Sequence, residues 1–398
     1  MKRAVSFILS AIITLGIVVP VISAQQSKKN TIQIMELRWK KVEKFAQDQM
    51  PESALKEVDA ILTQARKDKN SPQIIKAMIY RMRFLTDKNP DEAIPLLKEF
   101  EAYAEKSDNP AEKAIIHTMV ASLYNDYYQN NRWTIDQRTD LQGAIPDDIK
   151  EWTKNIFADK VVTQLELAIS NPKILQETDS KVYEAIIEQG KDSRTMQPTL
   201  FDFLAYEKID LLKNFTNTDG KIYSDGISAN IVNEPNDAFI QGHILQTYNQ
   251  IIDFQKSKNN KPAVVYAELQ KLNFENPMKD NDYQVAIEKL EKQYGENEAV
   301  VEVLAEKATY YLQKNDDHPD DEDTDKNRKT AYEITLSGIK QYPNYKRIGL
   351  LKNIRNTILQ KSIHSENEKV AKPNIRLQIS VKSANISQLK LTVYKVNA

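Results

Sequence analysis

The sequence contains no cysteine and few glycines or histidines, and each shortage excludes a class of function. Of its 398 residues, none is cysteine, nine are glycine and four are histidine. Without cysteine there can be no disulfide, zinc–thiolate site, iron–sulfur cluster or cysteine nucleophile. Glycine is far below its usual share of roughly 7%, while lysine, glutamate, alanine and leucine are abundant. This composition favours helices.

An excess of charge of one sign is also missing. Lysine and arginine number 55 and aspartate and glutamate 56, which gives a formal net charge of −1. The sequence therefore gives no reason to expect nucleic acid or an anionic membrane as the main partner. At about 150 residues per domain, the length predicts two or three compact domains or one elongated array.

The first 24 residues differ from the rest. Lys2 and Arg3 precede an apolar run from Ala4 to Ile22, and two small residues follow it. This pattern predicts a cleaved secretory signal peptide over residues 1–24, with Ala24 as the last residue removed. An uncleaved transmembrane anchor is the alternative, because the run approaches the length needed to span a bilayer. The proline at position 20 and the small residues favour cleavage and export.

Residues 25–368 carry the pattern of amphipathic helices joined by short turns. Apolar residues recur at helical spacing within each segment, as in the stripe Leu55, Val58, Ile61, Leu62 and Ala65. Pro51, Pro90 and Pro110 each stand before an acidic residue at the start of such a segment. Proline suits the first turn of a helix, and acidic residues there meet the positive end of the helix dipole. These prolines therefore predict helix starts.

Two segments resemble each other more closely. Residues 286–295 and 336–343 both end a helical pattern on Lys-Gln-Tyr followed by glycine or proline. Such endings are similar to the tetratricopeptide pattern, in which each helical hairpin buries its face against its neighbours. The predicted fold is mainly α, an irregular array of tetratricopeptide-like helical hairpins over residues 25–368.

Two stretches interrupt the helical pattern. Residues 214–235 are polar and hold two of the nine glycines, so they predict a long loop with a short hairpin at Asp219-Gly220. Residues 315–327 form a low-complexity acidic run. Part of this run, 321–325, is similar to the first half of a calcium loop. However, Lys326 occupies the glycine position and Tyr332 the final acidic position, so we expect a solvated acidic loop.

The C-terminal residues change period. Ile375, Leu377, Ile379 and Val381 alternate with polar residues, and the apolar positions from Leu389 to Val396 continue the alternation after a turn-like Ser-Ala-Asn. Residues 369–398 therefore predict a β-hairpin that looks like the start of a β-sandwich.

Residues that could carry chemistry are scattered. The four histidines, His117, His243, His318 and His364, form no zinc-binding pair and are expected as ordinary surface or core residues. No glycine-rich phosphate loop or serine elbow is present. We expect no catalytic residues, no cofactor and no metal. A hydrolase that uses acidic residues such as Asp202 or Glu207 on one helix is the weakest alternative, because a catalytic pair needs two neighbouring acids with different protonation.

Bulky aromatic residues gather where a helix ends and the chain reverses. They are Tyr124, Tyr127, Tyr128, Trp133 and Trp152. We expect them to pack a corner between hairpins, with a ligand cradle as the alternative.

Several segments carry a resemblance to a known family through their order along the chain. They are Trp39–Glu43, Asn131-Arg132-Trp133 with Arg138-Thr139, Asp148-Ile149 with Trp152, Pro198–Ala205, Tyr248–Phe254, Leu269–Phe274, Gln341-Tyr342-Pro343 and Asn385–Val396. Together they resemble the N-terminal helical region of large bacterial alpha-2-macroglobulin family proteins, up to the first macroglobulin-type β domain. The resemblance spans nearly the whole chain after residue 24.

The resemblance implies an exported protein of the periplasm or cell envelope that belongs to a protease-trapping, endopeptidase-inhibitor superfamily. In that family a protease cuts a bait segment, and many members then bind it through a thioester of cysteine and glutamine. No functional residue of the family matches a position here, and a thioester is excluded without cysteine. We therefore expect a truncated or partial chain: a non-catalytic N-terminal module without bait region or thioester, which acts as a scaffold or docking platform.

The alternative is a free-standing exported tetratricopeptide-like scaffold. In both cases the expected partners are proteins, with target proteases only in the context of a complete family member. Neither nucleic acid nor a small-molecule substrate is expected.

Overall fold

A computed structural model describes residues 24–89, 92–139, 144–188, 190–216, 235–317, 323–367, 379–390, 392 and 394. It is 74% helical with a small antiparallel β-hairpin near the C-terminus, so the mainly α class is confirmed. The chain divides into two compact units, Met1–Ala267 and Glu268–Ala398, which are described separately below.

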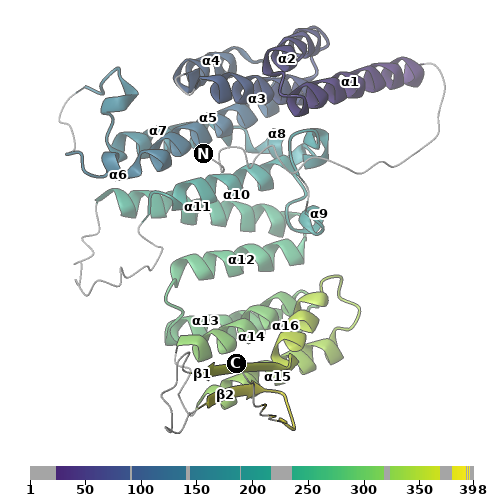
Figure 1. Cartoon of the computed structure of the whole chain (residues 1–398), viewed down its shortest axis with the longest axis vertical. Coiled ribbons are helices and arrows are strands. Elements are labelled where there is room, and N and C mark those ends of the chain that lie inside the picture. The colour runs from purple at the N-terminus through teal and green to yellow at the C-terminus, as the bar shows by residue number, and fades with distance from the viewer. Residues whose placement is uncertain are drawn as a thin grey trace. The chain divides into compact units, whose positions relative to one another are not determined.

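The first unit is built from helices α1 to α11 (Figure 1). Their bounds are α1 Ala24–Gln47, α2 Pro51–Lys67, α3 Ser71–Lys88, α4 Ala93–Lys106, α5 Pro110–Asn130, α6 Arg132–Ile135, α7 Lys154–Ala168, α8 Pro172–Glu177, α9 Ser193–Met196, α10 Leu200–Lys213 and α11 Pro235–Ser257. The 3-10 turns Ile149–Glu151 and Ser180–Tyr183 belong to the same unit.

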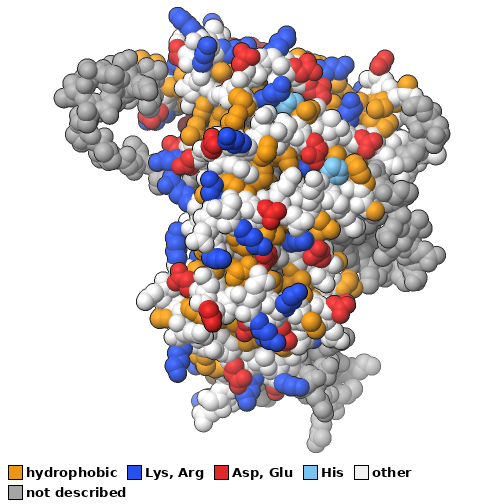
Figure 2. Space-filling model, turned by 180° about the vertical axis from the view of Figure 1, so that it is seen from behind, with side chains coloured by type: hydrophobic (Ala, Val, Ile, Leu, Met, Phe, Trp, Pro, Cys, Tyr) orange, Lys and Arg blue, Asp and Glu red, His pale blue; other side chains and the backbone are white. Residues whose placement is uncertain are grey.

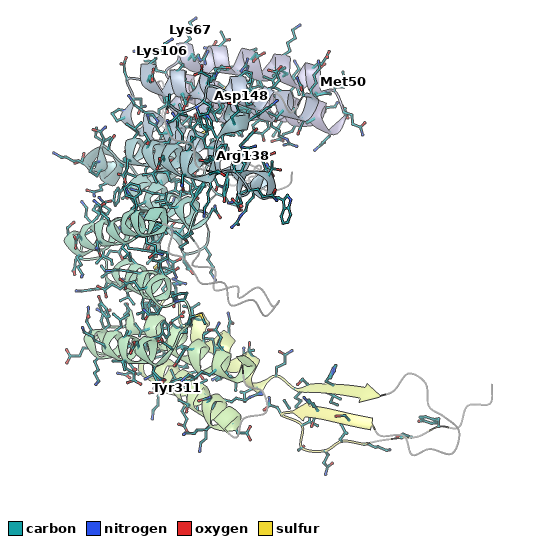
Figure 3. The ribbon with its side chains drawn as sticks, turned by 90° about the vertical axis from the view of Figure 1, so that its left-hand side faces the viewer. Met50, Lys67, Lys106, Arg138, Asp148 and Tyr311 are labelled. Atoms are coloured by element: carbon teal, nitrogen blue, oxygen red, sulfur yellow. The ribbon has the colours of Figure 1, made fainter. Side chains whose placement is uncertain are left out.

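Consecutive helices of the first unit pack as antiparallel neighbours. Helix α2 packs against α1 and α3, α5 against α4 and α7, and α10 against α11. In Figure 3, Met50 before α2 lies at one end of these hairpins, whereas Lys67 and Lys106, the last residues of α2 and α4, lie at the other. Helix direction thus alternates along the chain, as the predicted hairpin pattern requires.

The predicted proline starts agree with the structure where it describes them. Pro51 is the first residue of α2 and Pro110 the first residue of α5. The Asn109 side chain also accepts hydrogen bonds from the backbone N–H groups of Ala111 and Glu112, which satisfies two of the free donors at the start of α5. Pro90 lies outside the described residues.

In the second unit, the described residues form four complete helices and two strands. The helices are α13 Asn281–Tyr294, α14 Val300–Asp317, α15 Asp323–Gln341 and α16 Gly349–Leu359, and α12 Lys261–Glu275 crosses the boundary between the units. Helix α15 packs against both α14 and α16. Gly338 allows this approach: a Cβ atom there would lie 2.5 Å from Leu351 Cδ1 and 3.0 Å from Leu304 Cδ1.

The two similar Lys-Gln-Tyr segments both end helices. Helix α13 ends at Tyr294 and α15 at Gln341. The Tyr342 hydroxyl donates a hydrogen bond to the carbonyl oxygen of Gly295, so the residues that follow these two helices are in direct contact. The two similar segments therefore end helices whose following turns pack together.

The β-hairpin differs from the predicted one. Strand β2, Ile379–Ala384, overlaps the predicted first strand, but it pairs antiparallel with β1, Ser362–Asn367, which lies within the range that we assigned to helices. The described residues between 386 and 394 are not in a strand. Figure 3 shows the pair as a ribbon that extends away from the helices of its unit, and the apolar side chains of Ile363 and Val381 are exposed.

Asn385 lies in the turn-like segment that was expected to lead into the second strand. Its φ of 58° lies in the left-handed region. Its side-chain Nδ2 donates to the carbonyl oxygens of Ile358 at 2.8 Å and Gln360 at 2.9 Å, at the end of α16. These bonds therefore hold Asn385 against the end of α16.

The remaining expectations fall partly outside the described residues. Most of the predicted loop 214–235, including Asp219-Gly220, lies outside them, as does the predicted signal peptide before Ala24. The acidic run is not entirely a loop, because residues 315–317 end α14 and 323–327 begin α15. Among the helices that the structure describes, none has the length and apolar character needed to cross a lipid bilayer.

Candidate functional site

Helix α5 lies at the centre of the first unit. It packs against α3, α4, α7 and α10, and its buried residues lie on nearly every side of the helix. A helix that is apolar all round belongs to a core rather than to a surface. Two of its faces carry features of functional interest: a pocket toward α3 and α10, and a polar and aromatic cluster toward α7.

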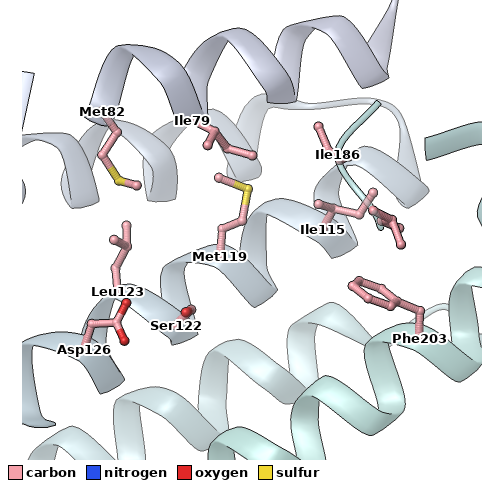
Figure 4. A pocket seen from close by; sticks show the side chains of 10 residues that line it. Ile79, Met82, Ile115, Met119, Ser122, Leu123, Asp126, Ile186 and Phe203 are labelled. Atoms are coloured by element: carbon pink, nitrogen blue, oxygen red, sulfur yellow. The ribbon is translucent and has the colours of Figure 1, made fainter. Parts of the chain in front are cut away.

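A small pocket lies beside α5 (Figure 4). It has more room than a single water molecule needs. The lining comes from α3, α5, α10 and the segment 186–187: Ile79, Met82, Ile115, Met119, Ser122, Leu123, Asp126, Ile186, Ile187 and Phe203. The isoleucines and Met119 are buried, whereas the other five residues are half-buried, so the pocket reaches the surface.

The pocket has an apolar end and a polar end. Ile115, Met119, Ser122 and Asp126 recur three or four residues apart, which places them on one face of α5. At 1.5 Å per residue, this face extends over about 16 Å. Figure 4 shows Ser122 and Asp126 toward one end of the face and Ile115, beside Ile186, toward the other.

Asp126 is the charged group of the pocket. Burial raises its pKa to about 6, and a hydrogen bond with Asn125 opposes this shift only in part. Among the residues that the structure describes, no lysine or arginine forms an ion pair with it. Near neutral pH the pocket therefore contains a carboxylate whose charge no cation of the described chain compensates.

Apart from the pocket, a polar cluster joins α7, α10 and α11. Glu166 Oε1 accepts from Lys208 Nζ at 2.5 Å and lies 2.7 Å from His243 Nδ1. Burial lowers the pKa of Lys208, partly against the effect of Glu166. For Glu166, burial acts to raise the pKa, but the hydrogen bonds and charges of Lys208 and His243 together lower it. The buried lysine is thus held by an ion pair, which is an arrangement that connects helices.

Asp202 and Glu207 do not form an acid pair. The Asp202 carboxylate closes the capping box of α10 with Thr199 and accepts from Gln255 Nε2 at 2.6 Å. Burial raises the pKa of Asp202, against these hydrogen bonds. Burial, with a smaller effect of Asp210, raises the pKa of Glu207 to about 7. Because five residues separate the two acids on one helix, they point about 140° apart.

The described histidines have different surroundings. His117 is buried, its Nδ1 lies 2.7 Å from Gln164 Oε1, and burial lowers its pKa. His243 belongs to the cluster around Glu166, and His364 lies on the exposed strand β1. His318 lies outside the described residues. Within the described ranges, no group of three or more acidic or histidine residues is placed to hold a metal ion.

The aromatic residues pack a corner between α5 and α7. Tyr124 stacks on Trp152 with ring centroids 5.6 Å apart, and Tyr127 stacks on Phe157 at the same distance. Arg138 stabilises the corner by donating a 2.6 Å hydrogen bond to the Trp152 carbonyl oxygen. The rings pack against one another, so these contacts favour the packed corner over the ligand cradle.

Trp133 departs from this expectation. Its side chain is 83% exposed, so it does not belong to the packed corner.

The pocket could not be found from the sequence. Its lining residues are ordinary core residue types, and they come from four segments more than a hundred residues apart at the extremes. Asp126, a carboxylate within the apolar pattern of α5, was the one available sign. Comparison of the chain with protein-family models, curated proteins and solved structures gives no match.

Proposed function

We propose that this chain is a non-catalytic scaffold for protein partners, and that it forms the N-terminal helical module of an alpha-2-macroglobulin-like protease-trapping protein. The observation that carries the scaffold role is the packing of consecutive helices against their neighbours in both units. Helical hairpins joined in this way expose long helix surfaces to partners, while only neighbouring hairpins bury each other. The exported location and the family remain parts of the proposal.

The surface charge supports protein partners. Figure 2 shows lysine and arginine side chains interspersed with aspartate and glutamate over the face in view. Mixed charges of this kind, with a formal net charge of −1, suit protein surfaces better than the phosphate backbone of nucleic acid.

Residues that carry the family resemblance take part in one structural feature, the corner after α5. Tyr128 and Arg132 both hold the Asp136 carboxylate, at 2.8 Å and 3.2 Å. The Trp152 ring nitrogen donates to the carbonyl of Pro146 at 2.7 Å. These bonds give Arg132 and Trp152, two residues of the resemblance, a structural role, which supports a shared fold for this region rather than a shared active site.

The genomic DNA after codon 398 tests the family proposal. We expect it to encode macroglobulin-type β domains followed by a bait segment, in the same frame or behind a frameshift. An unrelated gene directly after a stop codon would contradict the macroglobulin proposal and leave the scaffold role.

A free-standing scaffold is the second candidate, and the β-hairpin favours it. Strand β2 pairs with β1 over six residues, and Asn385 fastens the hairpin to α16. The hairpin thus takes its partner strand from the residues that follow α16 and its anchor from the end of α16 itself. Deletion of residues after Lys369 distinguishes the two: the free-standing scaffold should lose helix stability, whereas the start of a separate domain should leave helix melting unchanged.

A further inference from the structure

We propose that the pocket beside α5 binds an aliphatic chain that ends in an ammonium group, with the chain against the isoleucine and methionine side chains and the ammonium group on the Asp126 carboxylate. The pocket is a site for a chemically defined partner group, in addition to whatever surfaces the scaffold uses.

The arrangement of the lining residues favours an elongated ligand. Its apolar lining follows one face of α5 from Ile115 past Met119, and Ile79 and Met82 of α3 contribute to the same lining. Methionine side chains are unbranched and adapt to ligands of somewhat different outline. A methylene chain fits this lining, because the apolar side chains follow the same face of α5 that carries Asp126.

The charge of the pocket selects the end group. Asp126 lies among apolar residues, and its carboxylate has a hydrogen bond from Asn125 but no cation within the described residues. An ammonium group would supply both the opposite charge and the hydrogen-bond donors that this carboxylate lacks. A neutral alcohol would supply only a weaker donor, and a carboxylate ligand would be repelled.

A methylene chain with a terminal ammonium group has two natural sources. It is either a free alkylamine or the lysine side chain of a bound protein, which would connect the pocket to the proposed scaffold role. The same chemistry serves both, so the experiment uses both forms. The probes are n-hexylammonium, n-hexanol, hexanoate, and the acetyl amides of lysine and norleucine.

Methionine methyl groups provide the measurement. Met82 and Met119 line the pocket, and the chain has eight methionines in all. In the full chain after residue 24 with labelled methionine methyl groups, n-hexylammonium should shift the NMR signals of Met82 and Met119 near neutral pH. It should bind about tenfold more tightly than n-hexanol, as expected for a hydrogen bond to a charged group, and hexanoate should bind least.

Two variants make the test specific. Asp126→Asn should reduce the affinity for n-hexylammonium to that for n-hexanol, while n-hexanol binding stays the same. Asp87→Asn is the matched control, since Asp87 is an exposed residue of α3 that pairs with Arg83 and does not line the pocket. This control should retain the preference for the ammonium probe.

The lysine probe distinguishes the two sources of the ligand, a free alkylamine and the lysine side chain of a protein. Binding of the lysine amide, but not of the norleucine amide, would indicate a protein side chain, whereas binding of n-hexylammonium alone would indicate a free amine. The proposal is overturned if n-hexylammonium and n-hexanol bind equally, if Asp126→Asn retains the preference, or if the Met82 and Met119 signals do not move. These results leave both parts of the proposed function intact, because the scaffold role depends on the packing of consecutive helices and the family proposal is tested by the downstream DNA.

Discussion

Glu302 in the second unit and Asp126 in the first are both carboxylates among apolar side chains, but their surroundings differ. Glu302 is only 5% exposed, and it accepts from the Tyr345 hydroxyl at 2.8 Å and lies 3.4 Å from the Arg347 guanidinium. Asp126 is half-buried, and Asn125 is the only group that lowers its pKa. The first carboxylate has both a donor and a cation, and the second has only a neutral donor.

This difference separates a structural acid from a candidate ligand site. A buried carboxylate with its donors in place connects elements of the core, and its removal leaves those donors unpaired. A carboxylate without a cation works against folding when it is ionised, so its presence calls for another explanation. Binding of a cationic ligand supplies one for Asp126.

Two spectroscopic signals together distinguish the unfolding of the two units. The three tryptophans, Trp39, Trp133 and Trp152, all belong to the first unit, so their fluorescence reports its unfolding. Far-ultraviolet circular dichroism reports helices of both units. For each variant, the unfolding curve from fluorescence can therefore be compared with the curve from circular dichroism. A change that appears only in circular dichroism belongs to the second unit.

The largest expected effect is that of Glu302→Leu. This change removes the acceptor of Tyr345 and the counter-charge of Arg347, so it should lower the free energy of unfolding by about 3 kcal/mol or more. The loss should appear in circular dichroism during urea unfolding. Glu302→Gln, which keeps an acceptor for Tyr345, should lose less. If Glu302→Leu is as stable as the natural chain, the carboxylate is not a structural one.

Asp126→Asn should have the opposite sign. The folded-state pKa of about 6 lies above the usual aspartate pKa of 3.8, so the folded state holds this proton more tightly and stability falls as pH rises from about 4 to about 6. Asparagine avoids this loss, so the variant should be more stable near neutral pH. A shift of about two pKa units sets an upper limit of about 3 kcal/mol, which solvent screening reduces.

Tryptophan fluorescence during urea unfolding measures this gain. The difference between natural chain and variant should shrink as the pH falls below about 4, where Asp126 becomes protonated in both states. Taking the difference also removes the contribution of Glu207, whose raised pKa gives a slope of the same sign. A variant that is less stable near neutral pH would show that Asp126 has a stabilising partner.

Gln255→Met would make Asp202 more like Asp126. Gln255 is buried and donates at 2.6 Å to Asp202, which also has Thr199 as a partner. Loss of this donor should cost about 2 kcal/mol and raise the pKa of Asp202 further. The loss should be larger near neutral pH than in acid. A loss that is the same at both pH values would reflect packing rather than charge.

The smallest expected effect is that of Asn385→Gly. Glycine retains the left-handed backbone conformation but loses the two hydrogen bonds to the end of α16, so the second unit should lose about 1 kcal/mol. Asn385→Ala should lose more, because alanine also strains that conformation. Circular dichroism should detect both, with tryptophan fluorescence as the internal comparison. Equal stability of both variants and the natural chain would favour a hairpin independent of the helices.

Local sequence patterns were sufficient for the helices. Pro51 and Pro110 marked helix starts because a proline in the first turn needs no hydrogen-bond acceptor. The Lys-Gln-Tyr segments marked helix ends, and the aromatic residues after α5 pack a corner, with Trp133 as the exposed member. These features depend on a few neighbouring residues, which a single sequence contains.

The strand pairing and the pocket depend on residues far apart in the chain. Strand β1 reads Ser-Ile-His-Ser-Glu-Asn and has one apolar residue, so no alternation marks it, and only its pairing with β2 makes it a strand. The pocket needs α3, α5 and α10 to meet around Asp126. The apolar residues of α5 surround the whole helix, so the periodicity alone could not tell which face would adjoin a cavity.

The close approach at Gly338 has a consequence for how this protein can vary. A Cβ atom at 338 would occupy the space of a Leu351 methyl group, so the two positions share one volume between α15 and α16. Any enlargement at 338 requires either movement of the leucine or a smaller residue at 351. Gly338→Ala combined with Leu351→Val should therefore be better tolerated than the sum of the two single changes, and in related sequences the two positions should change together.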